Sequence, residues 1–386
     1  MQIDPQLLLA VAVVLLAAIA GAELARLVGL PSVLGETLAG LLLGPSLLGL
    51  VAPGPAFELL AGMGVVVLMF IAGLETDLPG VRRVGRAAFL TALGGVLLSL
   101  FGGILAAQAL SLAPQALFLG VALTATSVSI SAQTLRELGR LQATEGSTVL
   151  GAALVDDVLG VLLLSILLGA TGGDPVWLAL AKVAVFFPVT WFAGGWLVRG
   201  LVVLKRHLRL RSASLALVLG LLLIYAWAAA FASLAPVTGA YVLGLLVARY
   251  MGPEDAARRS AVALGLGFLV PIFFANLGLQ AHLAGLFTAP ATSALLILVA
   301  VLGKVIGCGI GALAGGLAWR PALLAGIGMV PRGEVTLVIA GAGLAAGVLD
   351  VTLFSVLIAL VLIASLLTPA LLRLGYALMD RPGGGP

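Results

Sequence analysis

The sequence predicts an all-α polytopic membrane protein. The predicted fold has thirteen transmembrane helices in two inverted six-helix repeats joined by a linker helix, with two broken helices that cross. Three observations predict it. The composition is 62% hydrophobic and only 9% charged, whereas a soluble chain carries about a quarter of charged residues. Apolar runs of about 20 residues, the length that crosses a bilayer core, recur along the chain. Short patterns of the first half also return in the second half.

The apolar runs define thirteen predicted spans. They start near Gln6, Ser32, Ala56, Arg86, Pro114, Glu145, Pro175, Ser212, Pro236, Ser260, Thr288, Pro321 and Asp350. All but three of the twenty lysine and arginine residues then fall in loops after odd-numbered spans or in the tail, the exceptions being Lys182, Lys304 and Arg332. Because positive loops stay cytoplasmic, we expect the N-terminus outside and the C-terminus in the cytoplasm.

The internal repeat rests on a constant spacing. Pro31 opens the second span and Pro236 the ninth, 205 positions later, and Gly73 and Gly278 are separated by the same interval. An offset of seven spans inverts the second copy, so spans one to six repeat as spans eight to thirteen. Chance similarity among glycine- and leucine-rich helices is the alternative. Inverted repeats are typical of transporters, whose binding site lies where corresponding helices are broken.

Two adjacent acids, Asp156 and Asp157, lie inside the apolar stretch from Ser147 to Ala170. A carboxylate at the centre of a membrane helix costs about 2.5–3.5 kcal/mol, so the pair predicts an ion site. The alternative is simple hydrogen bonding between helices. Consecutive helical residues point about 100° apart, so we expect one carboxylate to face Lys304 and the other to face open water.

Span eleven contains four glycines at intervals of four residues: Gly303, Gly307, Gly311 and Gly315. Such a row forms a smooth face that a neighbouring helix can approach closely. We expect this close approach to bring Lys304 to an aspartate on span six.

Spans five and twelve, which correspond in the repeat, are the predicted broken helices. The interruption in span five is polar: Thr124, Thr126, Ser127, Ser129 and Ser131. The hydroxyls of this segment suit either cation binding or ordinary bonding between helices. The interruption in span twelve is Pro331, Arg332, Gly333 and Glu334, where proline removes a helical hydrogen bond. We expect Arg332 and Glu334 to neutralise each other or the exposed helix ends.

Together the aspartate pair, Lys304 and the two broken spans resemble the monovalent cation:proton antiporter 2 family, and within it the bacterial sodium/proton antiporters. The resemblance implies a homodimer in the bacterial inner (plasma) membrane, with Na⁺ (or Li⁺) and protons as transported partners, no cofactor and no nucleic acid. It implies that Asp157 binds the cation, while Asp156 pairs with Lys304, which then serves as a proton carrier. The implied domains are residues 1–85 and 212–287 (dimerisation), 86–170 and 288–386 (core) and 171–211 (linker).

The sequence therefore predicts an electrogenic sodium (lithium)/proton antiporter with alternating access, in which Na⁺ and H⁺ compete for Asp156 and Asp157. Three alternatives remain: a proton- or sodium-coupled symporter of a small organic anion, a potassium/proton antiporter, and an intramembrane hydrolase. The hydrolase is disfavoured because the two acids of a catalytic dyad share one proton at close range, whereas neighbours on one helix diverge. The chain is accordingly not expected to be an enzyme.

Overall fold

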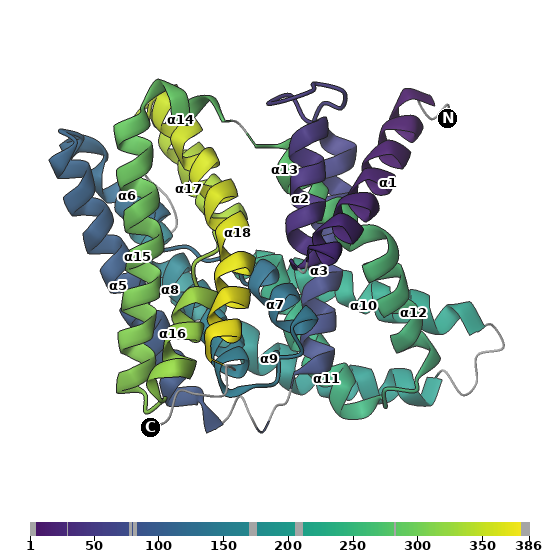
Figure 1. Ribbon diagram of the computed structural model, residues 1–386. Helices are drawn as coiled ribbons and strands as arrows, with labels where there is room; N and C mark the ends of the chain where they lie inside the picture. The colour runs from purple at the N-terminus through teal and green to yellow at the C-terminus, as the bar shows by residue number, and fades with distance from the viewer. Residues whose placement is uncertain are drawn as a thin grey trace.

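The computed structural model describes residues 5–28, 30–76, 79, 83–169, 176–204, 211–281 and 283–379. Within these ranges all regular secondary structure is helical (Figure 1). Most helices run between two faces of the molecule (Figure 1). We call them the N-terminal face, where the first helix begins, and the C-terminal face, where the last helix ends.

The helices follow the predicted spans closely. Those of the first half are α1 (Pro5–Leu27), α2 (Ser32–Leu43), α3 (Pro55–Glu75), α5 (Gly85–Ala109), η1 (Ala113–Gln115), α6 (Ala116–Ala122), α7 (Val128–Glu137) and α8 (Thr144–Gly169). Helix α9 (Val176–Leu204) follows. Those of the second half are α10 (Arg211–Phe231), α11 (Pro236–Tyr250), α12 (Ala256–Leu264), η2 (Gly265–Leu269), α13 (Val270–Leu279), α14 (Ala284–Thr288), α15 (Pro290–Ala314), α16 (Trp319–Gly328), α17 (Glu334–Ala345) and α18 (Val351–Met379).

Each predicted start lies within four residues of the start of a helix, the largest difference being Ser260 against Ala256. Apolar runs form helices in a membrane because every backbone group must find its partner inside the segment. Proline in the first turn helps to set the beginnings of α3, α11 and α15, where its missing N–H is not needed.

Eight helical segments of the described chain are long and apolar enough to cross a bilayer. They are Pro5–Leu27, Pro55–Glu75, Gly85–Ala109, Leu180–Leu201, Ser214–Phe231, Ala256–Leu279, Pro290–Ala314 and Val351–Met379. The chain is thus a multi-pass membrane protein. The count of thirteen crossings and the inverted repeat stay predictions. The linker prediction also covers residues 171–175 and 205–210, which lie outside the described residues.

The helices pack in two groups. In the first, α1, α2, α3, α11 and α13 pack on one another; in the second, α5 packs on α6, α8 and α15, and α15 packs on α16 and α18. Helix α7 contacts both groups. The largest cluster of buried apolar side chains spans the two groups and includes residues of α3, α8 and α11.

The first group is held by two glycine crossings. At one, a Cβ on Gly73 of α3 would lie 2.9 Å from the Cα of Gly244 on α11. At the other, a Cβ on Gly278 of α13 would lie 2.9 Å from the carbonyl carbon of Gly40 on α2. The third helix of each half therefore crosses the second helix of the other half, an arrangement that a two-fold repeat would produce.

The glycine row of α15 packs against α5 and not against α8. A Cβ on Gly307 would lie 2.4 Å from the carbonyl oxygen of Gly94, and one on Gly311 would lie 2.0 Å from that of Leu90. The row makes the expected close helix contact with α5 as its partner, and Lys304 of the same helix reaches an aspartate of α8, as expected. A face without side chains fits any smooth partner, so the row predicted a close contact without identifying the helix that makes it.

Candidate functional site

Two helices are broken at the centre of the second group, at the predicted segments. The first break separates α6 from α7 at residues 123–127, and the second separates α16 from α17 at residues 329–333. The breaks touch: the backbone N–H of Ser127 donates to the carbonyl oxygen of Pro331 at 2.9 Å. Backbone freed at membrane depth needs partners in the protein, and here each break supplies them to the other.

The hydroxyls of the first break serve the same purpose. Thr126 donates to the carbonyl oxygen of Met329 at 3.4 Å, and Ser131 donates to that of Gly328. The hydroxyl oxygens of Ser127 and Ser129 lie 3.2 Å apart. These contacts account for the polar character of span five as bonding between and within the broken helices.

Arg332 lies fully buried in the second break. Its Nη1 donates to the carbonyl oxygen of Ala125 at 2.8 Å, and its Nη2 donates to that of Ala300 at 2.9 Å. The guanidinium therefore neutralises the exposed carbonyl end of the first broken helix, one of its two expected roles. Its Nε has no partner among the described residues. Glu334 was the other residue expected to neutralise charge in this segment. Its side chain lies outside what the structure describes.

The two aspartates of α8 contact side chains of two different helices. Lys304 Nζ of α15 lies 3.0 Å from Oδ1 of Asp156, and both side chains are almost fully buried, with exposed fractions of 0% and 4%. Gly95 of α5 makes this reach possible, since a Cβ there would lie 3.1 Å from Cδ of Lys304 and would clash with the sulfur of the buried Cys308. The charge pair compensates much of the cost of burying either group.

Asp157, one residue further, points to another helix. The hydroxyl of Thr238 on α11 donates to Oδ2 of Asp157. The neighbouring Tyr241 lies one turn along α11, and its hydroxyl donates to Oγ1 of Thr76 at 3.2 Å. The two carboxylates point to different surroundings, as expected: Asp157 is half-buried and faces the first group of helices across a very small cavity. Its access to open water stays a prediction.

That cavity has a volume of about 10 Å³. Asp157, Thr238 and Tyr241 supply its polar lining, and Met69, Val128, Leu150, Ala153, Leu154 and Val237 supply the apolar lining. A space of this size holds about one water molecule. In this conformation it has no room for an organic substrate.

A larger cavity of about 480 Å³ leads from the first turn of α3 to the two breaks. Glu58, Gln280 and Asn276 line it, and Ser127 and Arg332 lie at its inner end. Because α3 begins at the N-terminal face, this cavity connects that face with the middle of the molecule. Val237 lines both this cavity and the small one at Asp157.

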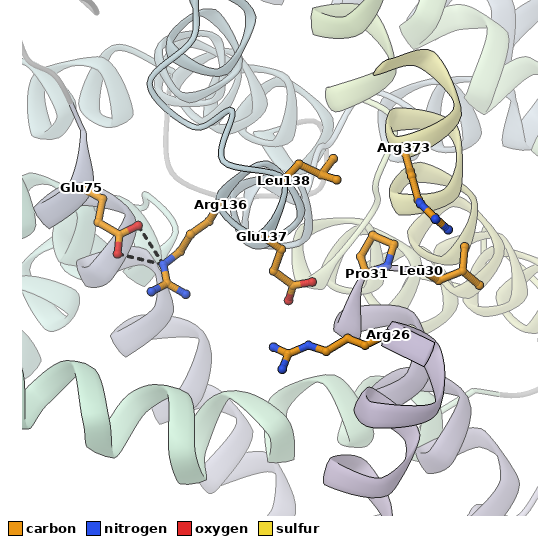
Figure 2. A pocket seen from close by; sticks show the side chains of 8 residues that line it. All are labelled: Arg26, Leu30, Pro31, Glu75, Arg136, Glu137, Leu138 and Arg373. Atoms are coloured by element: carbon orange, nitrogen blue, oxygen red, sulfur yellow. Dashed lines mark hydrogen bonds and ion pairs between the residues drawn. The ribbon is translucent and has the colours of Figure 1, made fainter. Parts of the chain in front are cut away.

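Toward the C-terminal face a pocket of about 680 Å³ is lined by charged residues (Figure 2). Two polar links cross between the helix groups here. Arg136 of α7 lies 2.8 Å from the carboxylate of Glu75 on α3, and Glu137 of α7 accepts from the backbone N–H of Ser32 on α2 at 2.8 Å. None of the residues lining this pocket lines the Asp157 cavity.

Sequence reasoning missed Thr238 and Tyr241. A threonine and a tyrosine near the start of an apolar helix carry no signal of their own, because hydroxyls are inexpensive in a membrane helix. The available clue was the repeat, which placed Pro236 opposite Pro31 and so marked the start of this helix. It did not show which face of the helix meets the aspartates.

A membrane bundle that is all-helical in its described residues, with two touching broken helices and an aspartate pair of which Asp156 is buried, defines a class: a secondary transporter of the broken-helix type. Residues 12–373 match the family model described as "Sodium/hydrogen exchanger, transmembrane". The chain belongs to the sodium/hydrogen exchanger family. The prediction of a cation:proton antiporter is thereby confirmed. Membership of the monovalent cation:proton antiporter 2 family stays a prediction.

Similar proteins agree with this family. The chain is 34% identical over 377 residues to the Na(+)/H(+)-K(+) antiporter GerN of Bacillus cereus, covering 96% of each chain. It is also 34% identical to a Na(+)/H(+) antiporter of Enterococcus hirae, covering 93% of this chain and 95% of the other. The solved structure of the sodium proton antiporter MjNhaP1 from Methanocaldococcus jannaschii matches with a TM-score of 0.73 at 19% identity, covering 98% and 99%. This likeness shows a shared fold.

Proposed function

We propose that the chain is an electrogenic sodium (or lithium)/proton antiporter working by alternating access, and that Asp157 binds the cation. The observation that carries this proposal is the cavity of about 10 Å³ that Asp157 lines together with Thr238, Tyr241 and apolar residues. The carboxylate oxygens of Asp157 suit a hard cation such as sodium. A symporter of an organic anion needs a roomier site, so the cavity size argues against that alternative.

Exchange follows from competition at the carboxylate. At high proton concentration Asp157 is protonated and excludes the cation; at low proton concentration it is ionised and binds it. Neither cargo can bind while the other is present, so each turn of the cycle carries one or the other. The empty, ionised site crosses reluctantly because a bare charge in hydrocarbon costs several kcal/mol, about 2.5–3.5 on insertion scales.

The second proton is carried by the Asp156–Lys304 pair. A cation arriving at the aspartates competes with Lys304 for Asp156, and Lys304 serves as the proton carrier of the pair. Two protons then exchange for one sodium ion, so one net charge crosses in each cycle. Such a step responds to the membrane potential by about 2.3 kcal/mol per 100 mV.

Alternating access requires two bodies that move against each other. We assign residues 1–85 and 212–287 to a dimerisation domain and residues 86–170 and 288–386 to a core domain, because the helices of each set pack mainly on one another. Residues 171–211 then link the two halves. In this conformation the larger cavity opens from the N-terminal face, while the Arg136–Glu75 and Ser32–Glu137 links join the domains toward the C-terminal face.

We propose that the chain crosses the membrane thirteen times. In support, α2, α8, α11 and the two broken pairs α6–α7 and α16–α17 would add five crossings to the eight long apolar segments. With the N-terminus outside, the larger cavity faces outward. The two glycine crossings between halves, at Gly73 and at Gly278, support the inverted repeat.

Exchange in proteoliposomes tests the proposal. Vesicles carrying a pH-sensitive dye are given sodium, lithium or potassium, and sodium-driven proton movement is expected for the wild type and absent for Asp157→Asn. Asp350→Asn is the matched control, since Asp350 caps the start of α18 by accepting from the N–H of Leu353 at 2.7 Å, and asparagine caps equally well. An Asp157→Asn protein that exchanges like the control contradicts the assignment. Proton movement that ignores an imposed voltage contradicts electrogenicity.

Potassium is the one alternative cargo that a specific observation favours. The name of the Bacillus cereus relative includes both sodium and potassium. The small volume at Asp157 favours sodium and lithium, which are smaller than potassium. The potassium arm of the same assay decides this point.

A further inference from the structure

Asp157 accepts a hydrogen bond from a helix of the other helix group. Its own helix, α8, packs on α5 and α16, while Thr238 belongs to α11, which packs on α3 through the Gly73 crossing. Thr238 is 2% exposed. Its hydrogen bond to Asp157 therefore joins the two groups of helices at the depth of the cation site.

The other aspartate is held differently. Lys304, the partner of Asp156, lies on α15 in the same helix group as α8. A salt bridge within one group travels with the site when that group moves. The Thr238 bond must break in the same movement, because its donor stays behind on α11.

The strength of this bond depends on what Asp157 carries. A hydrogen bond to an ionised carboxylate is roughly twice as strong as a bond between neutral groups. It is therefore strongest when Asp157 is ionised and empty. A proton on the carboxyl removes the charge, and a cation on Oδ2 takes the lone pairs that the hydroxyl uses, so either cargo weakens the bond.

We propose that Thr238 is a positioning residue that tethers the empty, ionised Asp157 to α11 and so prevents the unloaded site from crossing. This inference rests on the proposed function and adds a coupling element to it. Loading with either cargo releases the tether, and the domain then moves. The fixed exchange of cation for proton is thus enforced by a specific hydrogen bond as well as by the general cost of moving a bare charge.

The test removes the hydroxyl and measures coupling. Vesicles containing wild type, Thr238→Val or Thr238→Ser are loaded with radioactive sodium and diluted into sodium-free buffer of the same alkaline pH, with the voltage held at zero. In the wild type and Thr238→Ser, return of the site needs a proton, so sodium release is slow. In Thr238→Val the empty site returns, so sodium release is expected to rise about tenfold, the factor that corresponds to about 1.4 kcal/mol. The number of protons moved per sodium ion falls accordingly.

Thr37→Val is the matched control. Thr37 is also a buried threonine of the first helix group, but its hydroxyl donates to Val33 of its own helix at 2.8 Å. It is expected to keep the wild-type ratio of protons to sodium. If Thr238→Val does not fold, Thr238→Ala removes the same hydroxyl and gives the same readouts.

A Thr238→Val protein with an unchanged ratio of protons to sodium would overturn the tether. If its KM for sodium is also raised, the hydroxyl is a cation ligand instead. Failure of the proposed function is distinguishable, because then the wild type itself shows no exchange in the same vesicles.

Discussion

Removing one partner of the Lys304–Asp156 salt bridge should destabilise the protein far more than removing one partner of a surface pair. The charged atoms are 3.0 Å apart and almost completely buried. At an effective dielectric constant of about 20, charges at this separation attract by about 5 to 6 kcal/mol. Removing one partner strands the other charge, and such losses are typically about 3–5 kcal/mol. Lys304→Met and Asp156→Leu should each lower the free energy of unfolding by about this amount.

The double variant separates pairing from packing. With both charges gone, no ion is stranded, so the double variant should be more stable than the sum of the two single losses predicts, by at least about 2 kcal/mol. The measurement is unfolding in mixed micelles with increasing denaturing detergent. The same cycle on Arg136 and Glu75 is the control, because these side chains are 25% and 32% exposed and such pairs contribute about 0–1 kcal/mol. Additive losses at Lys304 and Asp156 would refute the reasoning.

Two further predictions use the same unfolding assay. Gly278→Ala places a Cβ 2.0 Å from a backbone carbonyl oxygen of α2 and should destabilise the protein by about 1–3 kcal/mol. Gly220→Ala is the control: its Cβ meets open space, so this variant should be neutral or stabilising. Equal effects of the two substitutions would contradict the glycine crossing. Arg332→Met removes the donors to the carbonyl oxygens of Ala125 and Ala300 and should cost about 1–3 kcal/mol for each unsatisfied group. Arg332→Lys should restore only part of this, since an ammonium lacks the planar fork; a fully stable Arg332→Met would exclude the proposed role.

Much of the fold follows from local properties that the sequence displays directly. Apolar runs and the prolines that begin helices placed the start of α2 at Ser32 and that of α11 at Pro236, where the structure has them. The break in α16–α17 was predicted from proline and glycine in one short segment. These features depend on hydrogen bonding within a segment and on its own solvation, so no partner needs to be known.

The candidate site was predictable in part. Two carboxylates and an amine in apolar spans are costly enough to stand out, and the structure brings Lys304 to Asp156. The sequence did not show which residue donates to Asp157 or which helix meets the glycine row of α15. Both depend on how helices distant in sequence are rotated about their axes, and a rotation that buries the same apolar area gives no signal in a single sequence.

The sequence by itself showed that the chain lies in a membrane, where its helical segments and their breaks fall, and which charged residues lie inside apolar spans. It could do so because the cost of a polar group in lipid acts on each residue separately. The residues alone left open which of the two neighbouring acids meets Lys304, although the family resemblance implied Asp156. The tertiary structure places Asp156 at Lys304 and Asp157 at Thr238 across the helix groups. That division depends on a difference of about 100° between consecutive side chains and on the position of α11, which the packing of glycines at Gly73 and Gly244 fixes.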